Sequence, residues 1–222
     1  MTIKPQRYRI SFVVNRLYYP FTYPEILESL EKRGYQRRAT PPQPAMSGAR
    51  VYIAGYVAAK KGSHVELNEG KNLIACEGES INRVVAGFKE IIELSEKDFH
   101  LEMSKDIDYS EFISSVIVSN SGNPLELIRK FNEDAYNVFD EALGTETAGY
   151  TIRIVSKDRE PGDKNWFDIV ITPRVSTADK EYFVETVFRD EDIKNVIEFA
   201  SQSNSKIEAI INKIGGVVGI GE

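Results

Sequence analysis

Apolar residues near the C-terminus recur at intervals of three and four between positions 192 and 214. This spacing places them along one side of a helix and predicts a long amphipathic helix with a single buried stripe. Carboxylates at positions 190–192 suit the positive end of its dipole, and Gly215 with Gly216 predicts its end. We expect residues 215–221 to form a flexible tail. The stripe consists of Ile193, Val196, Ile197, Ala200, Ile207, Ile210, Ile211 and Ile214.

Alternating apolar and polar positions predict strands elsewhere in the chain. Helical spacing predicts three further helices, one of which begins near Thr22 and ends at Gly34. Three prolines within residues 39–48 exclude a helix or a central strand there, so we expect a surface loop. The predicted strands are residues 8–14, 51–59, 64–67, 72–77, 112–118, 150–156, 166–172 and 182–188, and the other two predicted helices are residues 80–95 and 123–143.

The predicted elements follow the same order twice, as strand, helix, three strands and helix. Residues 8–95 give this order once and residues 112–214 give it again. Such repetition indicates an internal duplication, although the same order can also arise by chance. We therefore predict an α+β fold, in which an antiparallel sheet carries helices on one face. It would be built from two similar β-α-β-β-β-α halves, residues 1–104 and 105–222.

One segment, Leu73-Ile74-Ala75-Cys76-Glu77-Gly78, joins a predicted strand to the helix at 80–95 through a glycine. With the repeated six-element half, it resembles the TATA-box-binding protein family. The resemblance implies one saddle-shaped sheet with helices on its back, and DNA as a partner. It covers residues 73–95 only, and the second half has Phe188-Arg189-Asp190-Glu191 in place of the glycine. The paired wedge phenylalanines of the family have no matched positions, so no residue role is carried over.

The composition is that of a soluble globular protein, with 41% hydrophobic and 28% charged residues. No apolar run approaches the ~20 residues that a membrane span needs, so we expect no membrane partner. The first nine residues lack the apolar core of a signal peptide, and the single cysteine, Cys76, excludes an intrachain disulfide. These features favour a cytoplasmic location.

The basic residues are unevenly distributed. Residues 1–50 contain nine Lys and Arg against three Glu, a net charge of +6, which leaves −12 for the rest of the chain. Aromatic residues at positions 18–23 stand beside Arg16, and interleaved aromatic and basic residues can bind nucleic acid. The alternative is that the cations pair with the acidic remainder of the fold and the aromatics pack against the first helix. The candidate nucleic-acid-binding residues are Arg7, Arg9, Arg16, Arg37 and Arg38.

No set of residues indicates acid–base, nucleophilic or metal chemistry. His64 and His100 lack metal-ligand spacing, and Cys76 lies in an apolar strand, where a small core residue is expected. The acidic clusters at 106–111 and 158–163 do not match a calcium loop. We therefore expect no catalytic residue, metal or cofactor, and a non-catalytic protein that binds nucleic acid or another protein. The alternatives are a metal-dependent enzyme built from loop carboxylates and a self-assembling structural subunit.

Overall fold

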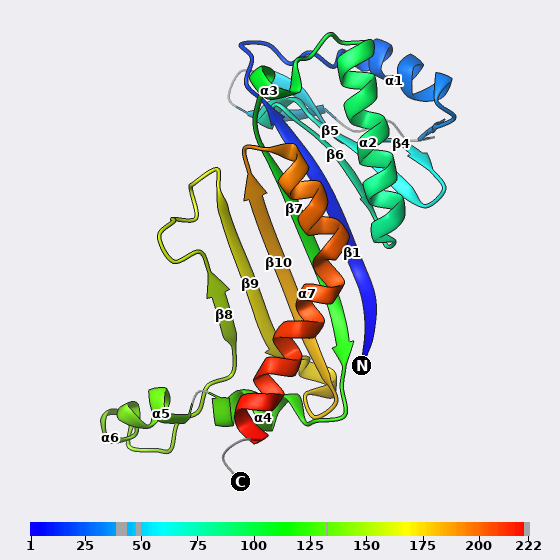
Figure 1. The fold of residues 1–222 in the computed structure, drawn as a ribbon. Helices are drawn as coiled ribbons and strands as arrows, with labels where there is room; N and C mark the ends of the chain where they lie inside the picture. The colour runs from blue at the N-terminus through cyan, green and yellow to red at the C-terminus, as the bar shows by residue number, and fades with distance from the viewer. Residues whose placement is uncertain (39–43, 48–49, 132, 220–222) are drawn as a thin grey trace.

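The computed structural model describes residues 1–38, 44–47, 50–131 and 133–219 (Figure 1). It shows an antiparallel sheet in the order β2-β4-β5-β6-β1-β7-β10-β9-β8, with β3 paired to β4. The strands are β1 (Thr2–Val14), β2 (Gln36–Arg37), β3 (Pro44–Ser47), β4 (Arg50–Lys60), β5 (Ser63–Asn68), β6 (Leu73–Gly78), β7 (Ile107–Ser119), β8 (Ile152–Val155), β9 (Trp166–Pro173) and β10 (Glu181–Asp190).

The helices cover one face of this sheet, which confirms the predicted α+β class (Figure 1). We call the opposite face of the sheet the free face. The α-helices are α1 (Tyr23–Lys32), α2 (Ile81–Lys97), α3 (Met103–Asp106), α4 (Pro124–Phe131), α5 (Glu133–Tyr136), α6 (Asp140–Leu143) and α7 (Ile193–Gly219), and the 3-10 helices are η1 (Glu69–Lys71), η2 (Asn137–Phe139) and η3 (Val175–Thr177).

The two longest strands, β1 and β7, pair at the centre of the sheet, from Thr2 opposite Ser119 to Val14 opposite Ile107. Side chains of β1 alternate between the faces. Ile10 and Phe12 are fully buried beneath the helices, whereas Arg9 projects from the free face. Each buried aliphatic or aromatic side chain contributes about 1.5–3 kcal/mol, so the register of β1 is strongly fixed.

Helix α7 packs on β7, β10 and β1 along most of its length (Figure 1). Its predicted stripe is confirmed: Val196, Ala200 and Ile211 are fully buried, and Ile214 at the end of the stripe is buried too. The predicted end of α7 is wrong, because the helix passes through Gly215 and Gly216 and continues to Gly219. A glycine ends a helix by adopting positive φ, as Gly34 does after α1, whereas Gly215 and Gly216 do not. The predicted flexible tail is therefore helical as far as Gly219.

The helix predicted over residues 123–143 is broken into α4, α5, η2 and α6. Its two ends are confirmed: the Asn123 side chain accepts hydrogen bonds from the backbone of the first turn, and Gly144 adopts φ +66°. Within the described part of the predicted stripe Ile128 is buried, whereas Val138 and Phe139 are exposed. Without a surface on which to bury the stripe, a continuous helix gains little from packing, and the segment breaks.

Two local predictions also change. The strand predicted at 112–118 begins earlier, since β7 starts at Ile107. Pro44–Ser47 form β3 rather than a loop, and this short strand pairs with β4 outside the main path of the sheet, where proline is tolerated. The remaining residues of the predicted loop at 39–43 and 48 lie outside the described residues.

Gly87 lies where α2 packs closely against β6. A Cβ atom added there would lie 2.8 Å from the sulfur of Cys76 and 3.3 Å from the hydroxyl oxygens of Ser63 and Tyr35. A Cβ atom added at Gly215 in α7 would meet no described heavy atom within 4 Å beyond its own helix backbone and chain neighbours. The two helical glycines therefore differ in the space around them.

We predict opposite effects of alanine at these two positions. Gly87→Ala destabilises the fold by about 1–2 kcal/mol, because an overpacking cost of about 2–3 kcal/mol exceeds the ~1 kcal/mol gained in helix propensity. Gly215→Ala stabilises it by about 0.5–1 kcal/mol, because only the propensity term operates. Urea denaturation followed by circular dichroism measures both. A Gly87→Ala variant as stable as the parent would contradict the close packing of α2 on β6.

Candidate functional site: an arginine-lined hollow

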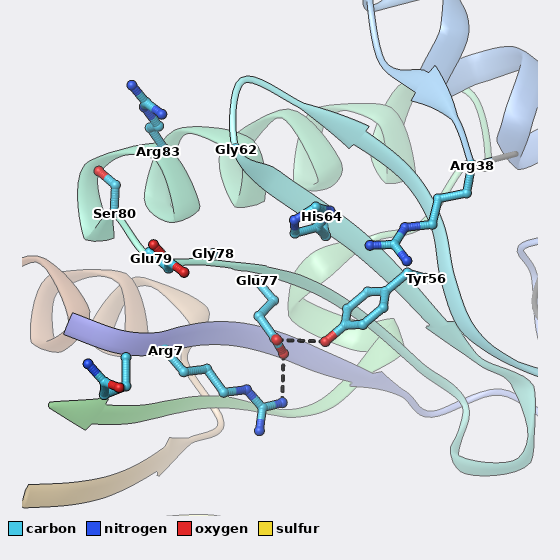
Figure 2. Close-up of a pocket in the computed structure, with 11 residues that line it drawn as sticks. Arg7, Arg38, Tyr56, Gly62, His64, Glu77, Gly78, Glu79, Ser80 and Arg83 are labelled. Carbon is cyan, nitrogen blue, oxygen red and sulfur yellow. Dashed lines mark hydrogen bonds and ion pairs between the residues drawn. The ribbon is translucent and has the colours of Figure 1, made fainter. Parts of the chain in front are cut away.

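The free face contains a hollow of about 740 Å³ at the point where β6 passes into α2 (Figure 2). Strands β1, β4, β5 and β6 supply its floor, and the first turn of α2 supplies one wall. Its lining residues are Gln6, Arg7, Arg38, Tyr56, Gly62, His64, Glu77, Gly78, Glu79, Ser80 and Arg83. We call this feature the arginine hollow.

The floor of the arginine hollow is organised around Glu77. Its carboxylate accepts hydrogen bonds from the guanidinium of Arg7 and from the hydroxyl of Tyr56, both at 2.6 Å (Figure 2). Burial raises the pKa of Tyr56 to about 12, with a further contribution from the bond to Glu77. Burial lowers the pKa of Arg7, but the hydrogen bond to Glu77 and the charge interactions with Glu77, Tyr56 and Glu66 together outweigh burial, so the pKa is raised overall. Arg7 and Glu77 therefore neutralise each other.

Two other arginines of the hollow have no carboxylate partner among the described residues. The guanidinium carbon of Arg38 lies over the ring of Tyr56, 5.0 Å from its centroid. Arg83 stands in the first turn of α2, beside the β4–β5 turn at Gly62. Figure 2 shows Arg38 and Arg83 at opposite ends of the hollow, with His64 between them. Both side chains belong to exposed residues and can meet an incoming anion.

The start of α2 adds positive potential to the same hollow. The Ser80 side chain forms no capping hydrogen bond with any described residue, and the first turn of α2 contains no acidic residue. The start of α7 differs, because the carboxylates of Asp190 and Asp192 accept backbone hydrogen bonds there, at 2.7 and 2.9 Å. Uncapped N–H groups at a helix start favour an anion. Glu79 stands beside them. With three arginines against Glu77 and Glu79, the formal charge of the whole lining is +1.

The structure separates the five candidate arginines. Arg7 and Arg38 both line the hollow, whereas the other three lie outside it. Arg9 is 7% exposed, and its Nε lies 2.9 Å from a carboxylate oxygen of Glu66. The remaining two form the ion pairs Arg16–Asp106, at 2.6 Å, and Arg37–Glu31, at 3.0 Å.

Of the residues that line the hollow, sequence reasoning selected Arg7 and Arg38 and missed the others, Arg83, His64 and Tyr56 among them. Arg83 carries a recognisable signal, because it follows the predicted helix start at Ser80 by three residues. His64 was interpreted as a surface residue beside a turn, yet its Nδ1 is buried without a hydrogen-bond partner among the described residues. Tyr56 carries no signal, because only folding brings its ring between Arg38 and Glu77.

The other sequence candidates have structural roles. Phe21 is buried and packs edge-on against Tyr19 and Phe99, so part of the aromatic cluster belongs to the core. Cys76 is fully buried, as expected for a small core residue, and burial raises its pKa to about 12.

The acidic clusters do not assemble into a metal site in the described structure. The carboxylates of the first cluster each pair with a different cation, and no group of three or more His, Cys, Asp or Glu among the described residues is placed to hold a metal ion. These pairs are Asp106–Arg16, Asp108–Lys164 and Glu111–Arg189.

Comparison with known proteins does not assign a family. No protein-family model matches the chain, and no curated protein matches it. Among the described residues, the helices are too short or too polar to cross a membrane. A function for this chain is therefore inferred from the geometry of the arginine hollow.

We predict that Glu66 matters more to the fold than Glu31, although each pairs with one candidate arginine. Glu66→Ala lowers the free energy of unfolding by about 2 kcal/mol, because it leaves the buried Arg9 with the Ser11 hydroxyl at 3.3 Å and, as its nearest described carboxylate, Glu77 at 3.9 Å. Glu31→Ala is the matched control and changes stability by less than about 0.5 kcal/mol, because its pair with Arg37 is exposed. Urea denaturation distinguishes them, and equal effects would contradict a structural role for Arg9.

Proposed function

We propose that this protein is a non-catalytic binding protein whose ligand is a single-stranded nucleic acid held in the arginine hollow. The observation that carries the proposal is the presence of Arg38 and Arg83 at opposite ends of the hollow, without carboxylate partners among the described residues. Two separated cations suit a ligand with repeated negative charges, and successive phosphates provide them.

The rings between the two arginines support a single strand. Tyr56 and His64 lie with their ring centroids 5.7 Å apart in the hollow. Unpaired bases can stack on such rings or on guanidinium planes, whereas the bases of a duplex are already stacked on one another. The hollow therefore favours a strand whose bases are accessible.

The charges elsewhere on the free face support this location. Arg189 pairs with Glu111 at 2.5 Å, and Arg153 pairs with Asp168 at 2.7 Å. Paired cations offer little net attraction to phosphates. On the described free face, unpaired arginines gather at the hollow, so we place the ligand there rather than along the whole sheet.

We also infer that the two halves are structural repeats. Apart from the two-residue strand β2 at one edge, the strand order from that edge is β4-β5-β6-β1, and from the other edge it is β8-β9-β10-β7. This symmetry supports the resemblance to the TATA-box-binding protein family at the level of architecture. The start of α7 then corresponds to the start of α2. Carboxylates of residues 190–192 accept the backbone hydrogen bonds at the start of α7, whereas the backbone N–H groups that follow Ser80 have no side-chain cap among the described residues and favour an anion. Under this inference only the first half binds nucleic acid.

Fluorescence anisotropy tests the proposed function with labelled single-stranded DNA, single-stranded RNA and duplex DNA. We expect single strands to bind more tightly than duplex, and the affinity to fall between about 50 and 200 mM salt as counterions are released. Arg38→Ala/Arg83→Ala should weaken binding at least ~10-fold and reduce the salt slope for a single strand by about 1.4, since each phosphate contact contributes about 0.7.

Arg37→Ala is the matched control, because Arg37 neighbours Arg38 in the sequence but pairs with Glu31 outside the hollow. It should leave the affinity within about twofold of the parent, as expected for an exposed charge without ligand contact. Absence of binding at low salt, or equal losses in the Arg37 and Arg38/Arg83 variants, would refute the proposed function.

A further inference from the structure

Strand β8 has an unpaired edge, at the opposite end of the sheet from β2 and β4 (Figure 1). The backbone N–H of Ser156 donates to the carbonyl of Phe167, and the register continues with Ile154 opposite Ile169. Because hydrogen-bonded pairs fall at every second residue, Arg153 and Val155 direct their N–H and C=O groups away from β9. Within the described structure, no strand pairs with this edge, so these groups can receive another strand.

An apolar groove of about 840 Å³ runs beside β8, between α4–α5 and the C-terminal part of α7. Phe131, Tyr136, Ile210 and Ile214 contribute to its walls. Six of the ten exposed large hydrophobic residues in the described chain fall within residues 131–155, and two of them, Phe131 and Val155, line this groove. Such a concentration marks an interaction surface rather than scattered apolar exposure. The six are Phe131, Val138, Phe139, Leu143, Tyr150 and Val155.

The charges at the groove indicate the chemistry of its occupant. Lys157 and Lys213 line it, both are exposed, and neither pairs with a carboxylate among the described residues. Arg153 also lines it but already pairs with Asp168. A complementary occupant would bring carboxylates to the two lysines and apolar side chains to the groove.

We propose that the edge of β8 binds an extended segment of a partner protein in which acidic and apolar residues alternate. Its backbone pairs with Arg153 and Val155, its apolar side chains enter the groove, and its carboxylates meet Lys157 and Lys213. Strand addition of this kind takes affinity from the backbone and specificity from side-chain pockets. A second copy of this chain fits less well, because joining two β8 edges would bring both sets of unpaired lysines into one interface.

The probe is a labelled, end-blocked peptide of alternating valine and glutamate, titrated into the full chain and followed by anisotropy. We expect saturable binding, and much weaker binding of a matched valine–lysine peptide. Lys157→Glu/Lys213→Glu should weaken the glutamate peptide at least ~10-fold and strengthen the lysine peptide, as reversal of charge complementarity requires. Lys89→Glu, an exposed position on α2, makes the same charge reversal at one site elsewhere, half the change of the double variant, and should have no effect.

Val155→Pro tests the backbone contact separately. Proline removes an N–H that points to the free edge, so the bonds between β8 and β9 remain while the incoming strand loses a donor. We expect at least ~10-fold weaker peptide binding with an unchanged urea midpoint, on the scale of one buried backbone hydrogen bond. Amide hydrogen exchange should show new protection at Arg153 and Val155 when the peptide binds to the parent chain.

Three results would overturn the proposal. The first is no binding of the glutamate peptide at millimolar concentration. The second is equal binding of the two peptides to the parent and to the Lys157→Glu/Lys213→Glu variant. The third is concentration-dependent dimerisation that Val155→Pro abolishes and the peptide does not inhibit, because this would assign the edge to a second copy of the chain.

Discussion

The register of β1 against its neighbours is the constraint on which the rest of the structure depends. The strand buries Ile10 and Phe12 beneath the helices, and alternation then sends Arg7 and Arg9 to the free face. A shift by one residue would place the arginines in the core, so hydrophobic burial fixes where these charges lie. Glu77 on β6 pairs with Arg7, and Glu66 on β5 pairs with Arg9. These ion pairs allow guanidinium groups to lie near the centre of the sheet.

This constraint separates cations that hold the fold from cations that have no carboxylate partner among the described residues. Arg9 lies near the centre of the sheet and is buried against Glu66. Arg38 and Arg83 stand at the ends of the hollow and form no ion pair with a described carboxylate. An overall charge of −6 therefore coexists with a local site that favours anions. The distribution of unpaired charge therefore locates a candidate site that the net charge does not reveal.

The sequence was sufficient for the elements whose periodicity matches their packing. The stripe of α7 and the start of α4 at Asn123 belong to this group. The breaks after α4 and the continuation of α7 through Gly215 were not predictable, because they depend on whether a neighbouring surface is present. Periodicity shows which residues could be buried together, but only the folded chain shows whether a surface exists to bury them.

The same limit applies to the candidate site. Two of the five arginines chosen from the basic N-terminal region reach the hollow. Arg9 and Arg16 instead pair with Glu66 and Asp106, which are remote in sequence, so their pairing could not be read from local pattern. Arg83 was missed because it lies in the acidic remainder of the chain, where no basic cluster drew attention to it.

The most direct test of this division of charges is an NMR titration of the arginine Nε–H signals with single-stranded DNA. The account predicts that the signals of Arg38 and Arg83 shift and saturate together, while those of Arg9 and Arg37 stay in place because their carboxylate partners hold them. Shifts of Arg9 or Arg37 as large as those of Arg38 and Arg83, or no shift in either of the latter, would contradict it.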